Sequence, residues 1–327
     1  MPNNPKLAVI GAGNIASFHV PALREAGFEV NSIAASPQSK NVKHFADEYK
    51  IPRIYEMPSQ LLESHREWDA LLICSSVEST LRYLKSAIEL GVPTLVEKPV
   101  SKNPKDLLSM VGGDYKVIVG YNRRFYKMVH EARDFVNSGA PVIATLTIPE
   151  LIETPKRLAD SPDYMSAFFT NSVHGLDLAR FVLGDITLKD VQHLRNDSGL
   201  CLGIVATFTS KNGNVLQFCG NWSAPANFGL ILDRQGARFS LSPFENAIIF
   251  DGIDVIEPTA ETPLRRYMPR PVKITELDGD DLCFKPGFVA QVRALMDLVR
   301  GVRSKTAATL DDAYAVLGIV ESLVEFP

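Results

Sequence analysis

Residues 11–16 form a glycine-rich turn whose residue types and spacing suit pyrophosphate binding. Their sequence is Gly-Ala-Gly-Asn-Ile-Ala, after a short apolar run and at the start of a helical stretch. The first glycine allows a tight turn, the second lets the backbone approach a phosphate, and the small last residue lets helix pack on strand. The helix N-terminus then faces the phosphate charge with unpaired N–H groups. Taken alone, such a turn can also be a tight connection that binds nothing. The strand before it and the helix after it favour dinucleotide binding through Gly11, Gly13, Asn14 and Ile15.

The segment after the second apolar run bears on the choice between NAD and NADP. An acidic residue about 20 positions after the glycines would bind the ribose 2′-hydroxyl and repel a 2′-phosphate. Residues 34–40 contain no acid, whereas Ser36 and Ser39 can donate hydrogen bonds and Lys40 carries a positive charge. The same residues also suit an ordinary turn and helix N-cap. We predict NADP or NAD as the cofactor, with NADP preferred.

Another apolar run ends in the charged sequence Glu97-Lys98-Pro99. In a parallel sheet, ligands bind beyond the carboxyl ends of the strands, which is where Lys98 falls. A lysine there can hydrogen-bond a substrate hydroxyl and stabilise the alkoxide character that develops as a hydride leaves. Taken alone, Glu97 and Lys98 are equally well a surface ion pair at a strand end.

These motifs occur in order with residues 119–125 (Val-Gly-Tyr-Asn-Arg-Arg-Phe) and 171–181 (Asn-Ser-Val-His-Gly-Leu-Asp-Leu-Ala-Arg-Phe). Together they resemble the glucose–fructose oxidoreductase/inositol dehydrogenase/rhizopine catabolism (Gfo/Idh/MocA) family, over the whole chain. The resemblance implies an α/β protein: an N-terminal Rossmann domain with a doubly wound parallel sheet, and a C-terminal α+β domain with a large open, mainly antiparallel sheet. It also implies an NAD(P)-dependent oxidoreductase acting on a CH–OH group of a sugar, polyol or sugar derivative, including a sugar nucleotide.

The resemblance assigns roles to individual residues. Lys98 and His174 become the catalytic pair, with Lys98 in the proton network and His174 nearest the reacting hydroxyl. Beyond the glycine turn, the expected cofactor contacts are Ser36, Lys40, Ser75, Ser76, Glu97, Lys98 and Asn122. The expected substrate contacts are Arg124, Tyr164, Thr170 and Asn171.

Two positions depart from the family pattern. Thr170 stands where many catalytic members have an Asp four residues before the histidine, so the proton relay lacks a carboxylate. Residues 75–80, Ser-Ser-Val-Glu-Ser-Thr, replace a Thr-Pro-x-x-x-His pattern, so a histidine beside the cofactor is absent. Both departures support an alternative, a catalytically silent dinucleotide-binding sensor or assembly protein on the same scaffold. The presence of both Lys98 and His174 favours the enzyme.

The elements that must position these residues follow two patterns along the chain. Up to about residue 120, short apolar runs alternate with helical stretches, which predicts a parallel sheet covered on both faces. The runs are Lys6–Ile10, Glu29–Ala34, Asp69–Cys74, Thr94–Glu97 and Lys116–Gly120. From residue 190 to 256, apolar runs alternate with Asn-Gly, Gln-Gly and Asp-Gly turns, which is typical of antiparallel hairpins.

The rest of the chain predicts a surface excursion and two closing helices. Residues 258–281 are rich in proline and charge, and Phe288–Val299 and Asp311–Leu323 have helical periodicity. The expected domains are 1–121, which binds NAD(P), and 122–327, which binds substrate and forms a homodimer or homotetramer through its sheet.

Length and composition exclude several classes of protein. A chain of 327 residues suits two domains, and its net charge of −4 argues against a nucleic-acid partner. No apolar run approaches the roughly 18 residues of a membrane helix, so a cytoplasmic protein is expected. No metal site is expected, because the cysteines form no zinc spacing. His19, His44, His65, His130 and His193 have no partners at ligand spacing, which predicts structural or exposed positions for them.

Overall fold

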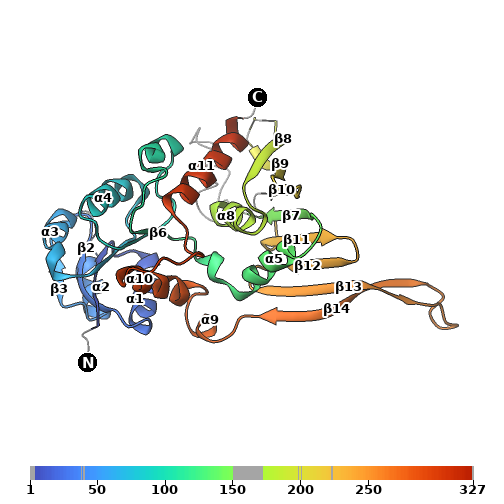
Figure 1. Cartoon of the computed structure of the whole chain (residues 1–327), viewed down its shortest axis with the longest axis horizontal. Helices are drawn as coiled ribbons and strands as arrows, with labels where there is room; N and C mark the ends of the chain where they lie inside the picture. The colour runs from blue at the N-terminus through green and yellow to red at the C-terminus, as the bar shows by residue number, and fades with distance from the viewer. Residues whose placement is uncertain are drawn as a thin grey trace. The chain divides into compact units, whose positions relative to one another are not determined.

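The structure, a computed structural model, describes residues 4–37, 39, 41–149, 172–197, 199, 201–221 and 224–325 (Figure 1). The chain divides into two compact units: residues up to Phe125 with Asp278–Gly318, and Tyr126–Leu277 with residues from Ile319 onward. The predictions made for Lys40, Tyr164, Thr170 and Asn171 lie outside the described residues.

The first unit contains a six-stranded parallel sheet with the strand order β3-β2-β1-β4-β5-β6. Its strands are β1 (Lys6–Ile10), β2 (Glu29–Ala34), β3 (Arg53–Tyr55), β4 (Ala70–Ile73), β5 (Thr94–Val96) and β6 (Val117–Val119). The central strands are apolar at nearly every position because helices bury both faces of the sheet. This doubly wound order confirms the predicted Rossmann fold.

Helices cover both faces of this sheet. On one face, hydrophobic side chains of α1 (Asn14–Glu25), α2 (Val42–Glu48) and α10 (Phe288–Val299) share a core with the strands. On the other face, α3 (Pro58–Glu63) contacts β2, and α4 (Val77–Glu89) contacts β4 and β5. Short 3₁₀ helices complete the unit at η1 (His65–Glu67), η2 (Pro104–Met110) and η3 (Asn122–Phe125), with the short helix α9 (Asp280–Cys283).

The position of α10 corrects the expected domain division. Phe288, Val292 and Leu295 are almost completely buried in the Rossmann core, although the expected domain boundary places them in the second domain. The periodicity of α10 marks an apolar face but does not say which sheet that face covers. The first unit therefore extends to Phe125 and includes α9, α10 and the start of α11 (Leu310–Glu325).

The second unit contains an eight-stranded sheet with the order β14-β13-β12-β11-β7-β10-β9-β8. All neighbouring strands are antiparallel except β7 and β10, which confirms the expected mainly antiparallel sheet. The strands are β7 (Ile143–Ile148), β8 (Ile186–Arg195), β9 (Cys201–Ser210), β10 (Val215–Asn221), β11 (Gly229–Arg234), β12 (Ala237–Leu241), β13 (Asn246–Ile256) and β14 (Arg266–Glu276).

The two faces of this sheet differ sharply in composition. Helices α5 (Lys127–Asn137) and α8 (Ser172–Leu183) cover one face. On that face, a row of residues that are paired from strand to strand across the sheet is buried. It consists of Thr275, Ala247, Leu241, Leu230, Leu146, Phe218 and Ala206. The next row points the opposite way and consists of Ile274, Ile248, Ser240, Ile231, Thr145, Gln217 and Thr207. On this second face Ile274 is 61% exposed.

Strand β14 corrects the prediction of a surface excursion at residues 258–281. Residues 266–276 pair with β13 as the edge strand of the sheet. Pro269 and Pro271 lie within this strand, and proline is tolerated there because an edge strand has a ladder on one side only. All but one of the strand's residues are exposed, so the apolar alternation that identifies a half-buried strand is absent.

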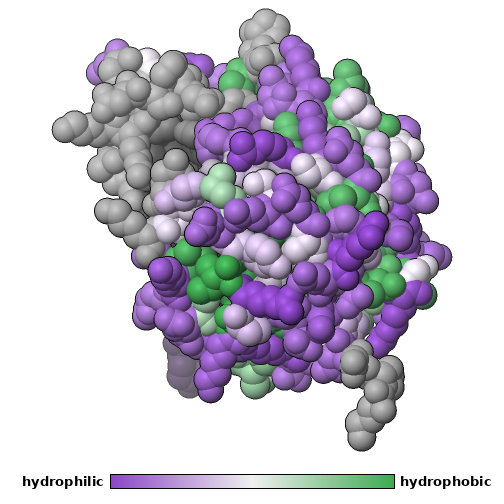
Figure 2. Space-filling model, turned by 90° about the vertical axis from the view of Figure 1, so that its left-hand side faces the viewer, coloured by the Kyte–Doolittle hydropathy of each residue, from purple (hydrophilic) through white to green (hydrophobic). Residues whose placement is uncertain are grey.

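The face of the structure in Figure 2 is mainly hydrophilic, with small separate hydrophobic patches. Among the described residues, no helix combines the length and apolar character needed to cross a membrane.

Candidate active site

The glycine turn connects β1 to α1, and a glycine is present at each of its two positions for a different physical reason. Gly11 has a φ of +115°, and a Cβ there would collide with the backbone carbonyl of Cys74. Gly11 is therefore required by the fold itself. A Cβ at Gly13 would meet no protein atom within 4 Å, and Gly13 is exposed. Since packing does not require a glycine at position 13, the open space is that of a cradle for a ligand.

The N-terminus of α1 has the features of a phosphate site. Gly13 is the N-cap, no side chain caps the helix, and the first turn holds no acidic residue. The N–H of Ala16 donates to the carbonyl of Gly13 at 3.0 Å. The N–H groups of Asn14 and Ile15, which precede it, suit an anion, and the helix dipole also favours one there. Asn14 is exposed and Ile15 half-buried at this end. These residues fit the pyrophosphate of a nicotinamide dinucleotide.

The end of β2 lies at the same edge of the sheet, because β2 is parallel to β1. Ala34 and Ala35 are buried, and Ser36 follows them in an exposed position. The backbone N–H of Ser39 donates to the carbonyl of Ser36 at 2.8 Å, forming a turn. The preference for NADP remains a prediction, since it also depends on Lys40.

Ser75 and Ser76 follow β4, again at the carboxyl edge. The hydroxyl oxygens of Ser75 and Thr80 lie 2.9 Å apart, and Thr80 is buried. Ser76 is exposed, and its hydroxyl lies 3.1 Å from that of Ser79. Thr80, which replaces the family histidine, thus ties Ser75, the residue before the N-cap of α4, to the first turns of that helix. The predicted cofactor contacts of both serines stay predictions.

Glu97 and Lys98 follow β5 and differ in exposure. Lys98 is half-buried, whereas Glu97 is only 8% exposed and has partners inside the protein. Glu97 Oε1 lies 2.6 Å from His19 Nε2, and Oε2 accepts the backbone N–H of Lys98 at 3.2 Å. Glu97 is therefore not a surface residue, and its carboxylate is engaged by protein groups next to Lys98.

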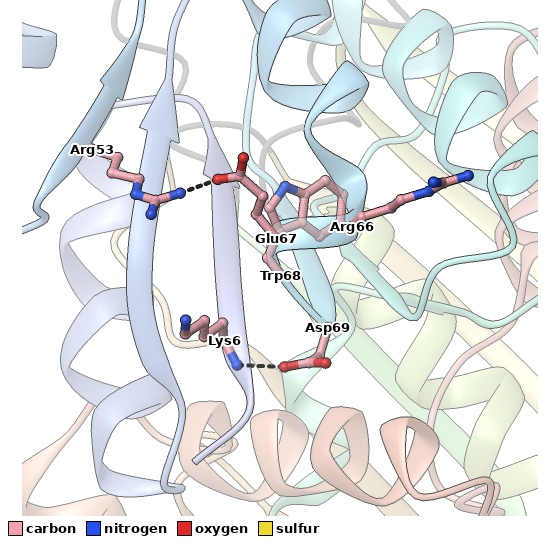
Figure 3. Close-up of a pocket in the computed structure, with 6 residues that line it drawn as sticks. All are labelled: Lys6, Arg53, Arg66, Glu67, Trp68 and Asp69. Atoms are coloured by element: carbon pink, nitrogen blue, oxygen red, sulfur yellow. Dashed lines mark hydrogen bonds and ion pairs between the residues drawn. The ribbon is translucent and has the colours of Figure 1, made fainter. Parts of the chain in front are cut away.

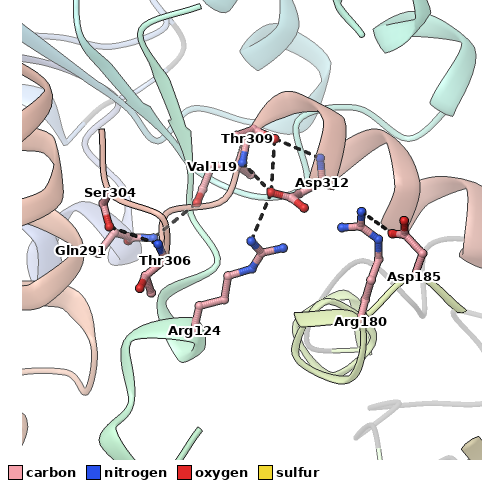
Figure 4. A network of polar contacts seen from close by, with 9 residues as sticks. All are labelled: Val119, Arg124, Arg180, Asp185, Gln291, Ser304, Thr306, Thr309 and Asp312. Atoms are coloured by element: carbon pink, nitrogen blue, oxygen red, sulfur yellow. Dashed lines mark hydrogen bonds and ion pairs between the residues drawn. The ribbon is translucent and has the colours of Figure 1, made fainter. Parts of the chain in front are cut away.

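Asn122 and Arg124 lie in η3, directly after β6, and both are buried. The amide nitrogen of Asn122 donates to the carbonyl of Pro286 at 2.8 Å. Arg124 pairs with Asp312 at the start of α11, and Asp312 also accepts the N–H of Thr309 (Figure 4). These contacts give both residues a structural function, and their contacts with cofactor and substrate stay predictions.

His174 lies in the first turn of α8, within the second unit. It is 9% exposed, and Asp177, one turn later, is 1% exposed. A Cβ at Gly175 would collide with the side chain of Ile148, so this glycine lets α8 approach β7 closely. Arg180 in the same helix pairs with Asp185 at 2.7 Å (Figure 4). The packing of α8 on β7 thus fixes His174 on a rigid element.

Two residues lie at this site without having been predicted there: His19, expected only to be structural or exposed, and Lys285. His19 pairs with Glu97, and Lys285 lies over the rings of Phe18 and Phe288 at 4.7 and 5.0 Å. His19 shares the apolar face of α1 with Val20 and Leu23, and a polar side chain on a buried face requires a partner. That pattern could have identified His19, but no local signal links Lys285 to β5.

A pocket lies at the opposite, amino-terminal edge of the sheet (Figure 3). The backbone N–H of Lys6 donates to Asp69 at 2.7 Å there, and Arg53 pairs with Glu67. Its lining consists of Lys6, Arg53, Arg66, Glu67, Trp68 and Asp69. None of the predicted site residues lies there. Over the residues that the structure describes, no cluster of His, Cys, Asp or Glu could hold a metal ion.

Comparison with known proteins matches both the Rossmann unit and the whole fold. A family model described as an oxidoreductase family with an NAD-binding Rossmann fold (GFO_IDH_MocA) matches residues 6–112. Myo-inositol 2-dehydrogenase from Thermotoga maritima is 23% identical over 190 residues, which are 55% of this chain and 55% of that protein. The chain therefore matches little more than half the length of this curated relative.

Solved structures match over nearly the whole chain. An oxidoreductase from Agrobacterium radiobacter, in complex with NAD+, L-tartaric acid and magnesium, has a TM-score of 0.76 and 18% identity, covering 98% of this chain and 96% of that one. UDP-N-acetylglucosamine 3-dehydrogenase from Acidithiobacillus ferrooxidans has a TM-score of 0.72 and 18% identity, covering 98% and 96%. At these identities the two structures show the shared fold. The Rossmann unit of this chain is therefore similar, over residues 6–112, to the NAD-binding domain of the Gfo/Idh/MocA family of oxidoreductases.

Proposed function

We propose that this chain transfers a hydride between a nicotinamide cofactor and a carbinol or ketone of a sugar, a polyol or a sugar derivative, including a sugar nucleotide. The observation that carries the proposal is the position of Lys98. It lies half-buried at the carboxyl end of β5, in the same sheet whose β1 ends in the open glycine cradle. The relatives support the substrate class, since one is named an inositol dehydrogenase and another a sugar-nucleotide dehydrogenase.

The chemistry divides between the cofactor and two side chains. In oxidation, the C–H hydride passes to the nicotinamide, the C–O bond becomes a carbonyl, and the hydroxyl proton leaves. The Lys98 ammonium hydrogen-bonds the substrate oxygen and stabilises its alkoxide character, and His174 accepts the proton. Reduction uses the same groups in reverse.

A substrate panel tests this function. Sugars, polyols and sugar nucleotides are incubated with the wild-type protein and NAD+ or NADP+, and nicotinamide absorbance is followed. Turnover of a compound bearing a secondary hydroxyl supports the proposal. The absence of turnover for every compound in the panel, while the cofactor binds, contradicts it.

One observation favours the rival function, a silent dinucleotide-binding sensor or assembly protein. Thr80 replaces a family histidine, and its hydroxyl bonds to Ser75 within the protein. The retained Lys98 and His174 favour the enzyme, because a silent protein has no need of both. The same substrate panel separates the two functions.

For the cofactor we propose NADP over NAD, because no acid follows β2 and Ser36 is exposed there. Titration calorimetry with NADP+ and NAD+ decides this preference. Tighter binding of NAD+ overturns it.

We propose a cytoplasmic homodimer or homotetramer that assembles through the C-terminal sheet and takes no nucleic-acid or membrane partner. The face of the sheet opposite α5 and α8 supports the assembly, because Ile143, Val205 and Ile274 are each more than half exposed. Sedimentation equilibrium measures the mass, and a monomer at micromolar concentration contradicts this part of the proposal.

A further inference from the structure

His19 is a buried polar residue that packing alone does not explain. Its side chain is 0% exposed on α1, and its ring lies against Phe288 with centroids 4.4 Å apart. Nε2 lies 2.6 Å from Glu97 Oε1, and Nδ1 has no hydrogen-bond partner among the described residues. An ionised carboxylate only accepts hydrogen bonds, so Nε2 carries the proton and donates it.

Glu97 is held from three sides. His19 donates to Oε1, the backbone N–H of Lys98 donates to Oε2 at 3.2 Å, and Gly120 of the neighbouring strand end lies against the carboxylate. A Cβ at Gly120 would lie 3.0 Å from three carboxylate atoms, so only a glycine leaves this side chain its room. The carboxylate is therefore fixed between α1 and the end of β6, with Oε2 on the backbone N–H of Lys98.

The titratable groups around Glu97 come from several elements. His19 faces it from α1, Cys74 from the end of β4, Lys98 from the adjacent position, and Lys285 from the segment before α10. Burial raises the pKa of Glu97, but the His19 hydrogen bond, the Lys98 charge and the Lys98 N–H outweigh burial and lower it. Burial and the nearby Glu97 charge both raise the pKa of the Cys74 thiol, which stays neutral.

Lys285 is the second cation near this carboxylate. Burial lowers its pKa, the Glu97 charge raises it, and Arg123 lowers it further, with a net decrease. Glu97 is thus the anion of a site that otherwise gathers positive charge. Losing its ionisation would change the electrostatics at Lys98 directly.

We propose that His19 is a positioning residue: its Nε2–H keeps Glu97 ionised and oriented, and Glu97 in turn orients the Lys98 backbone and holds its side chain in the ammonium form. The value of this arrangement for hydride transfer rests on the proposed function. Its effect on Lys98 is a property of the folded protein and is measurable without a substrate.

The experiment compares four full-length variants with the wild type at about pH 6. His19→Phe fills the space against Phe288 but has no donor, and His19→Gln keeps an amide donor. Glu97→Gln is permanently neutral, and His19 can face it through either tautomer. His44→Gln is the matched control, because His44 pairs with Glu48 at the surface, where the two side chains are 84% and 54% exposed.

Two readouts are taken from each variant. Infrared difference spectra report the C=O stretch of a protonated carboxyl group. Competitive acetylation with acetic anhydride, quantified by mass spectrometry, reports how often the Lys98 amine is neutral, with exposed Lys211 as the internal reference. Neither readout requires cofactor or substrate.

We expect His19→Phe to show a new protonated-carboxyl band and about tenfold faster acetylation of Lys98, the change that accompanies a shift of one pKa unit. Glu97→Gln should show the faster acetylation without the band, and His19→Gln and His44→Gln should match the wild type. A folded His19→Phe with no band and unchanged acetylation overturns the proposal. If that variant does not fold, unchanged acetylation in Glu97→Gln overturns it instead.

The outcome is independent of the substrate panel. If no compound in the substrate panel is turned over but the acetylation pattern is as expected, the proposed function is refuted and the positioning role is not. Turnover in the panel with unchanged acetylation refutes the positioning role alone.

Discussion

The guanidinium Nη1 of Arg124 lies 3.1 Å from Oδ2 of Asp312, which joins the segment after β6 to the first turn of α11. The Arg124 side chain is 5% exposed and that of Asp312 is 18% exposed. Asp312 Oδ2 also accepts the N–H of Thr309 at 2.9 Å, so one carboxylate oxygen caps the helix and binds the arginine. The pair therefore ties two distant parts of the chain within the Rossmann unit.

Replacing Arg124 should destabilise this unit. Arg124→Ala leaves Asp312 partly buried without its cation, which we expect to lower the free energy of unfolding by about 3 kcal/mol. Urea denaturation measures the loss. The control is Arg238→Ala, whose ion pair with Asp233 is 48% and 39% exposed and should contribute less than about 1 kcal/mol. Equal small losses in both variants would show that burial does not strengthen the Arg124 pair.

The two glycines of the turn should respond differently to valine. Gly13→Val should fold normally, because its Cβ enters open space, but should weaken NADPH and NADH binding at least about 100-fold, or about 2.7 kcal/mol. Gly11→Val should reduce stability itself, because its backbone is left-handed and its Cβ would collide with Cys74. Titration calorimetry and thermal denaturation separate the effects. Unchanged cofactor affinity in Gly13→Val would make the turn purely structural.

Once a substrate is identified, Lys98→Ala should lower turnover by about 10² or more while cofactor affinity changes only a few-fold. His174→Ala should lose a similar factor, and the double variant should lose much less than the product, since the two residues act on one proton. Steady-state kinetics gives all three values. Lys102→Ala is the control, because Lys102 is a half-exposed lysine paired with Glu78 at 3.2 Å. Full activity in Lys98→Ala would show that Lys98 only ends the strand and takes no part in the reaction.

Asp281 gives a pH-dependent prediction. Burial raises the pKa of its carboxyl, the N–H of Gly287 opposes this, and Asp278 and Asp280 raise it further. Since the folded pKa exceeds the unfolded one, stability falls as the pH rises through the ordinary value of 3.8 toward the raised one. Asp281→Asn keeps an acceptor for Gly287 and removes the charge. Its melting temperature should match the wild type at about pH 3 and exceed it at about pH 7.

Asp281→Ala serves as the control for this prediction. It loses both the charge and the acceptor of the Gly287 hydrogen bond, so it should melt below Asp281→Asn at both pH values. If Asp281→Asn melts below the wild type at about pH 7, the ionised carboxylate stabilises the segment and the prediction is wrong.

The strands of the Rossmann sheet could be predicted from sequence because burial on both faces makes each an apolar run. Lys6–Ile10 and Glu29–Ala34 coincide with β1 and β2 as the structure has them. β3 could not be predicted in this way, because Arg53 and Ile54 are exposed and the strand has three residues. β14 could not be predicted for the same physical reason, because its exposure removes the alternation of apolar and polar residues.

The candidate site shows the same division. The backbone chemistry of Gly11 and Gly13 is local, so spacing alone indicates their function. The partners of Glu97 are not local, since His19 lies 78 residues away and Gly120 follows another strand, β6. Arg124 likewise has a partner 188 residues away. Side-chain pairings across a fold depend on packing that no single stretch of sequence specifies.

The two prolines of β14 limit the pairing of a further strand with this free edge of the second sheet. Pro269 and Pro271 lie two residues apart in this edge strand and carry no N–H, so neither can donate a backbone hydrogen bond to an added strand. A foreign strand laid along this edge would find carbonyl acceptors without the matching donors, and the sheet could not be continued by backbone pairing there. The edge is thereby protected against open-ended strand addition, the route by which exposed sheets grow into fibres.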